Sequence, residues 1–199
     1  MRLTKRGIGW LKFMMHIMCL APIVFLVFVV LSDNAGGDPV QYIIHYTGMG
    51  ALNTLVVTLL LSPVAKRFKM AALIQTRRLM GLYVFAYASL HIAAFVSLDL
   101  LFAWAYLLEE IVKRPYILVG ATAYVIITAL AITSLHIVKR KMGKRWQQLH
   151  NWVYVVALLA PIHFYWSVKS EVIEPSLYII GLLTLLWLRR GNIKTGLAD

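Results

Sequence analysis

The chain has 199 residues, of which 61% are hydrophobic, and its formal net charge is +12 at pH 7. So large a basic excess can indicate a nucleic-acid-binding protein, but the apolar character and the grouping of the basic residues argue against that class. A single cysteine, Cys19, excludes an internal disulfide and a dithiol redox centre. The composition instead indicates a membrane protein.

Apolar runs of nearly membrane-spanning length recur along the chain. The hydrocarbon core of a bilayer is crossed by about 20 apolar helical residues. We predict six such transmembrane helices, at residues 10–31, 42–62, 79–98, 115–137, 150–168 and 172–188. Little sequence remains between them, so we expect an all-α, polytopic membrane protein in which residues 1–199 form a single domain.

Three local signals refine this pattern. Asp38 followed by Pro39 predicts the start of the second membrane helix, with an acidic cap and proline at the first helical position. Residues 100–114 are too short and too charged to span, and Trp104 and Tyr106 suit a membrane surface. We therefore predict an interfacial helix there, on the outer side. Arg189 and Arg190, which follow the last run, are expected to extend their side chains to the inner interface.

The basic residues predict the orientation of the chain. Seventeen of the twenty lie in four groups that alternating spans place on one side, at residues 2–12, 66–78, 139–145 and 189–194. Loops rich in lysine and arginine stay in the cytoplasm, so we expect both termini to be cytoplasmic. The same groups are suited to contact anionic membrane lipid, and we predict no nucleic-acid partner.

The six histidines divide into two levels across the membrane. His16, His136 and His150 are predicted near the cytoplasmic side, and His45, His91 and His163 near the outer side. Ionisable side chains within membrane helices usually face the bundle interior and serve a function. Since neutral imidazole is a common ligand of haem iron, this arrangement predicts a redox cofactor between the helices.

Two equal spacings suggest how the cofactor residues pair. His150 precedes His163 by thirteen residues, and Arg78, with Arg77 beside it, precedes His91 by the same number. We predict His91 and His163 as the two ligands of an outer haem. His150 would form an inner site, where an arginine is suited to bind a haem propionate, a flavin phosphate or a quinone carbonyl.

Simpler interpretations of the same residues stay open. His150 also suits a solvated position at the inner boundary, and Arg77 and Arg78 also suit ordinary topology-setting charges. Gly81 and the alanines around His91 either leave room for a flat ligand or serve ordinary helix packing.

Two segments carry a family resemblance. RRLMGLYVFAYASLH (77–91) and GKRWQQLHNWVYVVALLAPIH (143–163) resemble the ferric reductase-like transmembrane family, and DPVQYIIHYTG (38–48) extends the resemblance over nearly the whole chain. Larger relatives carry two histidines on each of the third and fifth spans. By this resemblance His91, His150 and His163 match three of those haem ligands, and the fourth position falls at Arg77 or Arg78.

The resemblance also implies cofactors and partners. It implies one haem b, or two, together with FMN, in a multi-pass protein of the bacterial inner membrane. Electrons would come from the quinone pool or a cytosolic flavin reductase, so we expect a donor that is a separate molecule. They would pass to a periplasmic molybdenum-containing methionine sulfoxide reductase that repairs oxidised envelope proteins.

Two other functions remain as alternatives. One is a stand-alone quinol or ferric reductase cytochrome, and the other is a haem-free transporter whose histidines relay protons. The sequence has none of the familiar catalytic motifs for making or breaking bonds, and we expect no methionine sulfoxide site in this chain. Its chemistry would belong to the cofactor, and the protein would determine where the cofactor lies and what its redox potential is.

Overall fold

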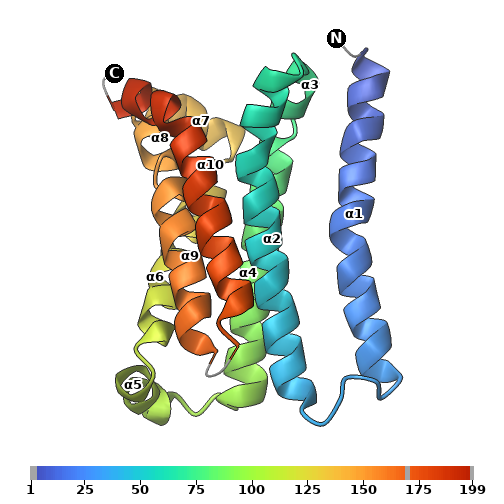
Figure 1. Cartoon of the computed structure of the whole chain (residues 1–199), viewed down its shortest axis with the longest axis vertical. Helices are drawn as coiled ribbons and strands as arrows, with labels where there is room; N and C mark the ends of the chain where they lie inside the picture. The colour runs from blue at the N-terminus through green and yellow to red at the C-terminus, as the bar shows by residue number, and fades with distance from the viewer. Residues whose placement is uncertain (1–3, 169–170, 198–199) are drawn as a thin grey trace. The chain divides into compact units, whose positions relative to one another are not determined.

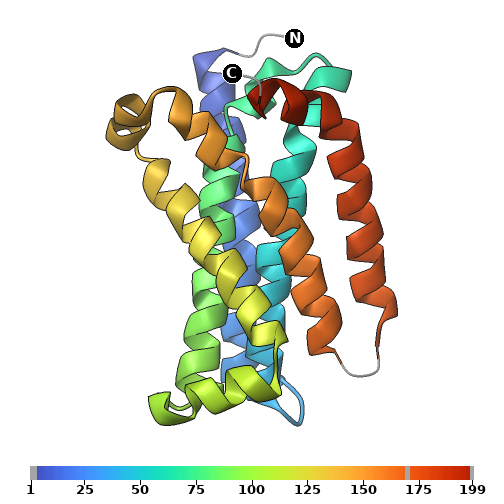
Figure 2. The ribbon, with the colours of Figure 1, turned by 90° about the vertical axis from the view of Figure 1, so that its left-hand side faces the viewer.

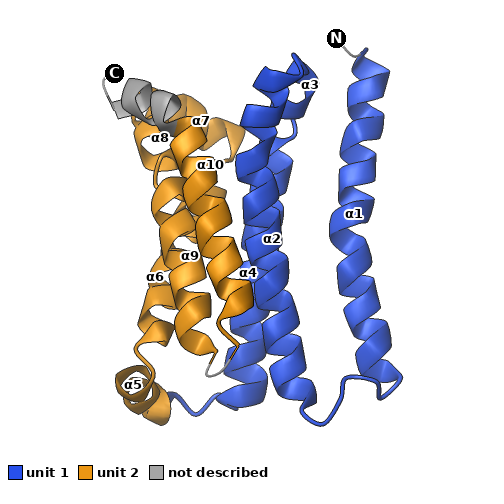
Figure 3. Ribbon diagram, in the orientation of Figure 1, with its two compact units in different colours: residues 1–104 blue, residues 105–199 orange. Residues whose placement is uncertain are grey.

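The computed structural model describes residues 4–168 and 171–197 of the chain. Within these residues every regular element is helical and there is no strand, which confirms the all-α prediction. The contacts divide the chain into two compact units, residues 1–104 and 105–199, coloured separately in Figure 3. The prediction that residues 1–199 form a single domain stays a prediction.

Unit 1 is a bundle built around one pair of long helices. Its elements are α1 (Lys5–Leu31), α2 (Pro39–Arg67), α3 (Ala71–Ile74), α4 (Arg77–Ala94) and a π-helical turn, η1 (Phe95–Asp99). The main packing is between α2 and α4, which lie side by side, while α1 makes fewer contacts (Figure 1). This pair positions His91, which lies in the last turn of α4.

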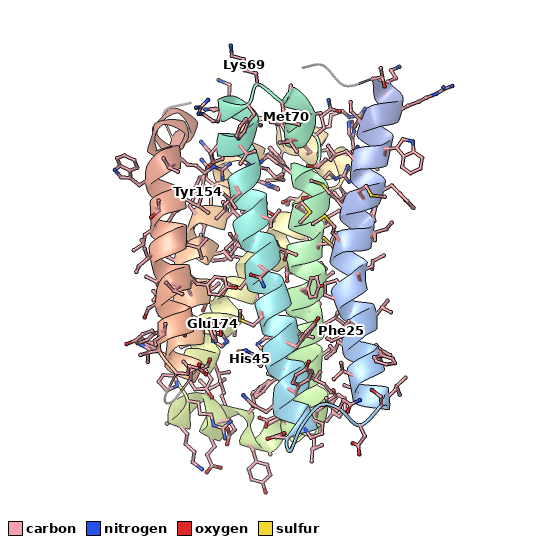
Figure 4. The ribbon with its side chains drawn as sticks, turned by 45° about the vertical axis from the view of Figure 1, so that its right-hand side comes forward. Phe25, His45, Lys69, Met70, Tyr154 and Glu174 are labelled. Atoms are coloured by element: carbon pink, nitrogen blue, oxygen red, sulfur yellow. The ribbon has the colours of Figure 1, made fainter. Side chains whose placement is uncertain are left out.

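The ends of α2 follow from its sequence. Asp38 Oδ1 accepts a hydrogen bond from the Gln41 backbone N–H at 2.9 Å, and Pro39 is the first helical residue, as predicted. At the other end Lys69 has a positive φ of 55°, which turns the chain into α3. Figure 4 shows the Lys69 side chain pointing away from α2 at this end, whereas His45 lies near the beginning of the helix.

The centre of unit 1 is a close approach between α2 and the ring of Tyr87 on α4. Tyr87 is 2% exposed, and a Cβ atom at Gly50 would lie only 2.3 Å from its Cδ1 atom. The Tyr87 hydroxyl donates to the backbone carbonyl of Cys19 on α1 at 2.7 Å. Cys19 is itself buried, as expected for a small core residue. One aromatic ring therefore links three helices.

Helix α1 presents apolar side chains outward along much of its length. The exposed set includes Trp10, Phe13, Met18, Val24 and Phe28. A long helix with such a surface is typical of a segment that faces lipid.

Unit 2 contains a second pair of packed helices. Its elements are α5 (Trp104–Lys113), α6 (Tyr116–Thr133), α7 (His136–Met142), α8 (Lys144–His150), α9 (Val153–Ser167) and α10 (Ile173–Leu197). Figure 2 shows α6 running beside α9, and α10 packs against α9 as well. Gly143, with a φ of 56°, forms the turn between α7 and α8, where a residue with a side chain would be strained.

Helix α5 matches the helix predicted between the third and fourth runs. Leu108 and Val112 are 75% and 82% exposed on its apolar face. On its polar face Lys113 Nζ lies 2.6 Å from Glu109 Oε1, and this partner raises the pKa of Lys113. An exposed helix with one apolar and one charged face is suited to a membrane surface.

The six apolar runs are all helical, but their boundaries differ from the predicted ones. Among the described residues, four helical segments are long and apolar enough to cross a membrane: Lys5–Leu31, Pro39–Arg67, Ala71–Asp99 and Tyr116–Thr133. The fourth run ends at Thr133 rather than at residue 137, and the fifth divides into α8 and α9. His150 is therefore the last residue of α8, and the prediction that it opens the helix carrying His163 is wrong.

Arg189 corrects a second expectation, whereas the side chain of Arg190 lies outside the part of the chain that the structure describes. Rather than extending to the interface, the Arg189 side chain is only 2% exposed, and its guanidinium carbon lies 5.6 Å from the centre of the Tyr154 ring. The aromatic face offers a favourable contact for this cation within unit 2.

Candidate functional site

His91 is held by the backbone of the neighbouring helix in unit 1. Its Nδ1 lies 2.8 Å from the carbonyl oxygen of Ile44 on α2, and the ring is partly buried. A carbonyl oxygen can only accept, so Nδ1 must carry the hydrogen. In the neutral ring the lone pair that binds a metal therefore resides on Nε2.

His163 is held in the same way in unit 2. Its Nδ1 lies 2.7 Å from the carbonyl oxygen of Tyr116, the first residue of α6. The Tyr116 ring also lies near the imidazole, with 5.7 Å between the ring centres. The same argument assigns the hydrogen to Nδ1 and the metal-binding lone pair to Nε2.

Two glycines line these imidazole rings. A Cβ atom at Gly48 would lie 3.1 Å from Nδ1 of His91, and a Cβ atom at Gly120 would lie 2.7 Å from Nδ1 of His163. Each ring therefore rests against helix backbone at a place where a larger residue would crowd it. A histidine that donates through Nδ1 to a carbonyl is the usual form of a metal-bound histidine. The donor set thus fits a haem iron, which takes histidine as an axial ligand.

His150 lies in a different kind of cluster. Its Nε2 is 3.1 Å from the hydroxyl oxygen of Thr133, and its ring stacks on Trp146 with 4.0 Å between the ring centres. The Trp146 indole N–H donates to the Thr133 carbonyl at 2.9 Å, and Lys139 Nζ lies 4.2 Å from the centre of the Trp146 ring. The residues Lys139, Trp146 and His150 therefore form a stack that is hydrogen-bonded to Thr133, the last residue of α6.

The hydrogen bonds of Thr133 indicate which nitrogen of His150 carries hydrogen. The hydroxyl has one hydrogen, and it donates this to the Ala129 carbonyl at 2.7 Å. Toward His150 the oxygen then acts as acceptor, so Nε2 of His150 is the donor. This is the opposite tautomer to that of His91 and His163, which distinguishes His150 from the other two.

The two predicted arginines begin α4. Arg77 is partly buried, and its Nε atom has no hydrogen-bond partner among the described residues, whereas Arg78 is exposed. These arginines and His91 belong to unit 1, and His150 and His163 belong to unit 2.

The remaining histidines have other surroundings. His16 on α1 is hydrogen-bonded to the Tyr83 hydroxyl, with 2.6 Å between Nδ1 and the oxygen, so it links α1 to α4. His136 lines an open hollow of about 380 Å³ together with Lys139, Arg140 and Gly143. His45 is exposed on α2.

Packed apolar helices, some of them long enough to cross a membrane, define an all-helical membrane protein. A family described as the ferric reductase like transmembrane component matches residues 42–161, which is more than half of the chain. This protein therefore belongs to that family, as its sequence resemblance predicted. The match extends from α2 into α9 and ends two residues before His163. Membership assigns the chain to the multi-pass membrane components of electron transfer.

Proposed function

We propose that this chain is the haem b electron-transfer subunit of a bacterial methionine sulfoxide reductase system, similar to MsrQ. It would reside in the inner membrane as six transmembrane helices, with both termini in the cytoplasm and α5 on the periplasmic surface. The observation that carries the proposal is the matching anchorage of His91 and His163, each through Nδ1 to a backbone carbonyl. Family membership supports the same class of function.

His91 and His163 are the proposed axial ligands of an outer haem. Both donate through Nδ1, which directs Nε2 to the metal and raises the basicity of the ring. The haem supplies a one-electron redox centre when bound. The chain's own contribution is to fix the two imidazoles and to surround them with apolar helices.

His150, with Arg77 or Arg78, is the proposed inner site, which would take a second haem or FMN. To bind iron through Nε2, His150 would have to release its hydrogen bond to Thr133. The partly buried guanidinium of Arg77 is suited to an anionic group such as a propionate or a phosphate. This inner site is where electrons would enter.

Six spans are proposed although α9 is short. With 15 residues it extends about 22 Å, which is less than the hydrocarbon thickness. The preceding helix α8 and the interfacial aromatic residue Trp152 can compensate for part of the difference between the length of α9 and the hydrocarbon thickness. The exposed apolar surface of α10, which includes Ile173, Leu177, Ile180 and Trp187, also suits lipid.

The proposed partners follow from this orientation. The electron donor is quinol or a cytosolic flavin reductase, and the acceptor is a periplasmic molybdoenzyme similar to MsrP. The basic groups on the inner side would contact anionic lipid. Reduction of methionine sulfoxide takes place on the acceptor, so this chain is a component of an oxidoreductase system.

Haem binding is tested on protein purified in detergent. We expect a low-spin haem b signal in the reduced-minus-oxidised spectrum, and its loss in His91→Ala and in His163→Ala. His45→Ala, another histidine predicted on the outer side, serves as the matched control and should keep the signal. Full haem in both ligand variants would refute the ligand assignment, and absence of haem from the wild-type protein would favour the transporter.

Electron transfer is tested by supplying one donor at a time to the haem-loaded protein in proteoliposomes. Quinol or a flavin reductase should reduce the haem, and added MsrP-like enzyme with methionine sulfoxide should reoxidise it. Reoxidation by ferric chelates alone would favour the stand-alone reductase instead.

A further inference from the structure

The surroundings of the two outer histidines are repeated along the chain. In each unit the carbonyl that anchors the histidine lies 47 residues before it. The glycine that faces the ring lies four residues after that carbonyl, on the next turn of the same helix. An offset of 72 residues relates the two sets, from Ile44 to Tyr116, from Gly48 to Gly120, and from His91 to His163.

We propose that Gly48 and Gly120 are positioning residues that set the orientation and the basicity of the two haem-ligating imidazoles. This inference rests on the proposed haem ligation by His91 and His163. A histidine cradle, as we use the term, consists of the anchoring carbonyl, the glycine one turn later and the histidine. Each unit contains one cradle within its own helix pair.

The first argument is steric. At Gly120 a Cβ atom would lie 2.7 Å from both Cε1 and Nδ1 of His163 and 3.2 Å from Cγ, which no unshifted ring can tolerate. At Gly48 the corresponding distances are 3.1 Å to Nδ1 and 3.2 Å to Cε1 of His91, so the ring there must shift by less. Glycine is a poor helix former, and its presence at both positions is explained by the space that the rings occupy.

The second argument is electronic. The Nδ1–H to carbonyl bond places partial negative charge on the imidazole and makes Nε2 a stronger donor to iron. A stronger axial donor is one of the means by which a protein tunes haem potential. The same glycine that admits the ring also allows the ring to reach the carbonyl one turn earlier. Displacing the ring should therefore lengthen the hydrogen bond and change the iron's electronic state together.

The experiment compares Gly120→Ala and Gly48→Ala with two controls of the same chemistry. Gly9→Ala in α1 and Gly181→Ala in α10 add the same methyl group where nothing lies within 4 Å of the new Cβ. The readouts are haem per chain, the low-spin electron paramagnetic resonance spectrum and the midpoint potential, measured on purified protein. The last two report ring orientation and donor strength, which a purely structural role would leave unchanged in the haem-loaded fraction.

We expect a graded result. Gly120→Ala should weaken haem binding by roughly 10- to 100-fold, the usual effect of losing an outer-shell partner. Its remaining haem should show an altered low-spin spectrum and a more positive potential. Gly48→Ala should change the same quantities in the same direction by a smaller amount, while both controls match the wild type.

Failure of this inference is distinguishable from failure of the proposed function. If His91→Ala and His163→Ala lose haem but both cradle variants keep the wild-type spectrum and potential, the positioning role is overturned and the ligation stands. If the histidine variants keep full haem, the proposed function itself fails. If Gly120→Ala does not accumulate in the membrane, the less disruptive Gly48→Ala variant tests the inference. An unchanged haem midpoint potential in Gly48→Ala then overturns it.

Discussion

The contact between Gly50 and Tyr87 makes a quantitative prediction about how unit 1 is held together. In Gly50→Ala the new methyl carbon would lie 2.3 Å from Cδ1 and 2.4 Å from Cε1 of Tyr87. Carbon atoms in van der Waals contact are about 3.5–4.0 Å apart, so the ring must move by about 1.2 Å or more. A comparable movement of the hydroxyl would carry its 2.7 Å bond to the Cys19 carbonyl beyond hydrogen-bond distance.

The cost combines two effects. Overpacking a filled site typically costs about 1–3 kcal/mol, and losing a hydrogen bond costs about 0.5–1.5 kcal/mol. We therefore expect Gly50→Ala to lower the free energy of unfolding by about 1.5–4.5 kcal/mol. Reversible unfolding in mixed micelles, followed by circular dichroism, measures this quantity. Gly81→Ala, where the added carbon contacts nothing within 4 Å, is the control.

A double-mutant cycle isolates the clash from other effects of the alanine. Tyr87→Ala removes the ring, so Gly50→Ala made in that background should cost less than about 1 kcal/mol. Additive behaviour, with the same cost in both backgrounds, would refute the close approach of this glycine to the ring. So would a cost no greater than that of the control.

Two further predictions concern the inner histidine and the orientation. Thr133→Val removes the hydroxyl that accepts from His150 Nε2, and because this bond competes with iron for Nε2 we expect the variant to bind haem at the inner site at least as tightly as the wild type, measured as haem per chain. A loss of haem relative to the wild type would contradict this competition. In a Cys19→Ser background, a membrane-impermeant maleimide should label Lys113→Cys in intact spheroplasts and Lys69→Cys only after permeabilisation. The reverse pattern would invert the proposed topology.

The locations of the helices were largely predictable because apolar runs of this length have few alternatives to forming a helix. The start of α2 was also predictable, since Asp38 and Pro39 act through local geometry. The break between α8 and α9 was not, because neither glycine nor proline marks it. Asn151 and Trp152 lie in this break, and the stack of Trp146 on His150 comes just before it.

The candidate histidines were identified from the sequence, but what holds them was not. Gly81 was a candidate for making room for a ligand because it lies on the same helix as His91. A Cβ atom at Gly81 would have no protein atom within 4 Å. Gly48 and Gly120 are distant from their histidines in sequence and resemble ordinary membrane-helix glycines. Aligning the sequence with itself at an offset of 72 residues would identify them, since this alignment pairs Gly48 with Gly120 and His91 with His163.

The confinement of each cradle to its own unit has a consequence for biogenesis. Ile44, Gly48 and His91 all precede the second unit in the chain, so they are translated before it. The first imidazole can thus acquire its bonded tautomer as soon as α2 and α4 associate, and Tyr116, Gly120 and His163 repeat the process later. On the proposed ligation, each half would present its histidine already in the tautomer that a metal requires, before any haem is bound.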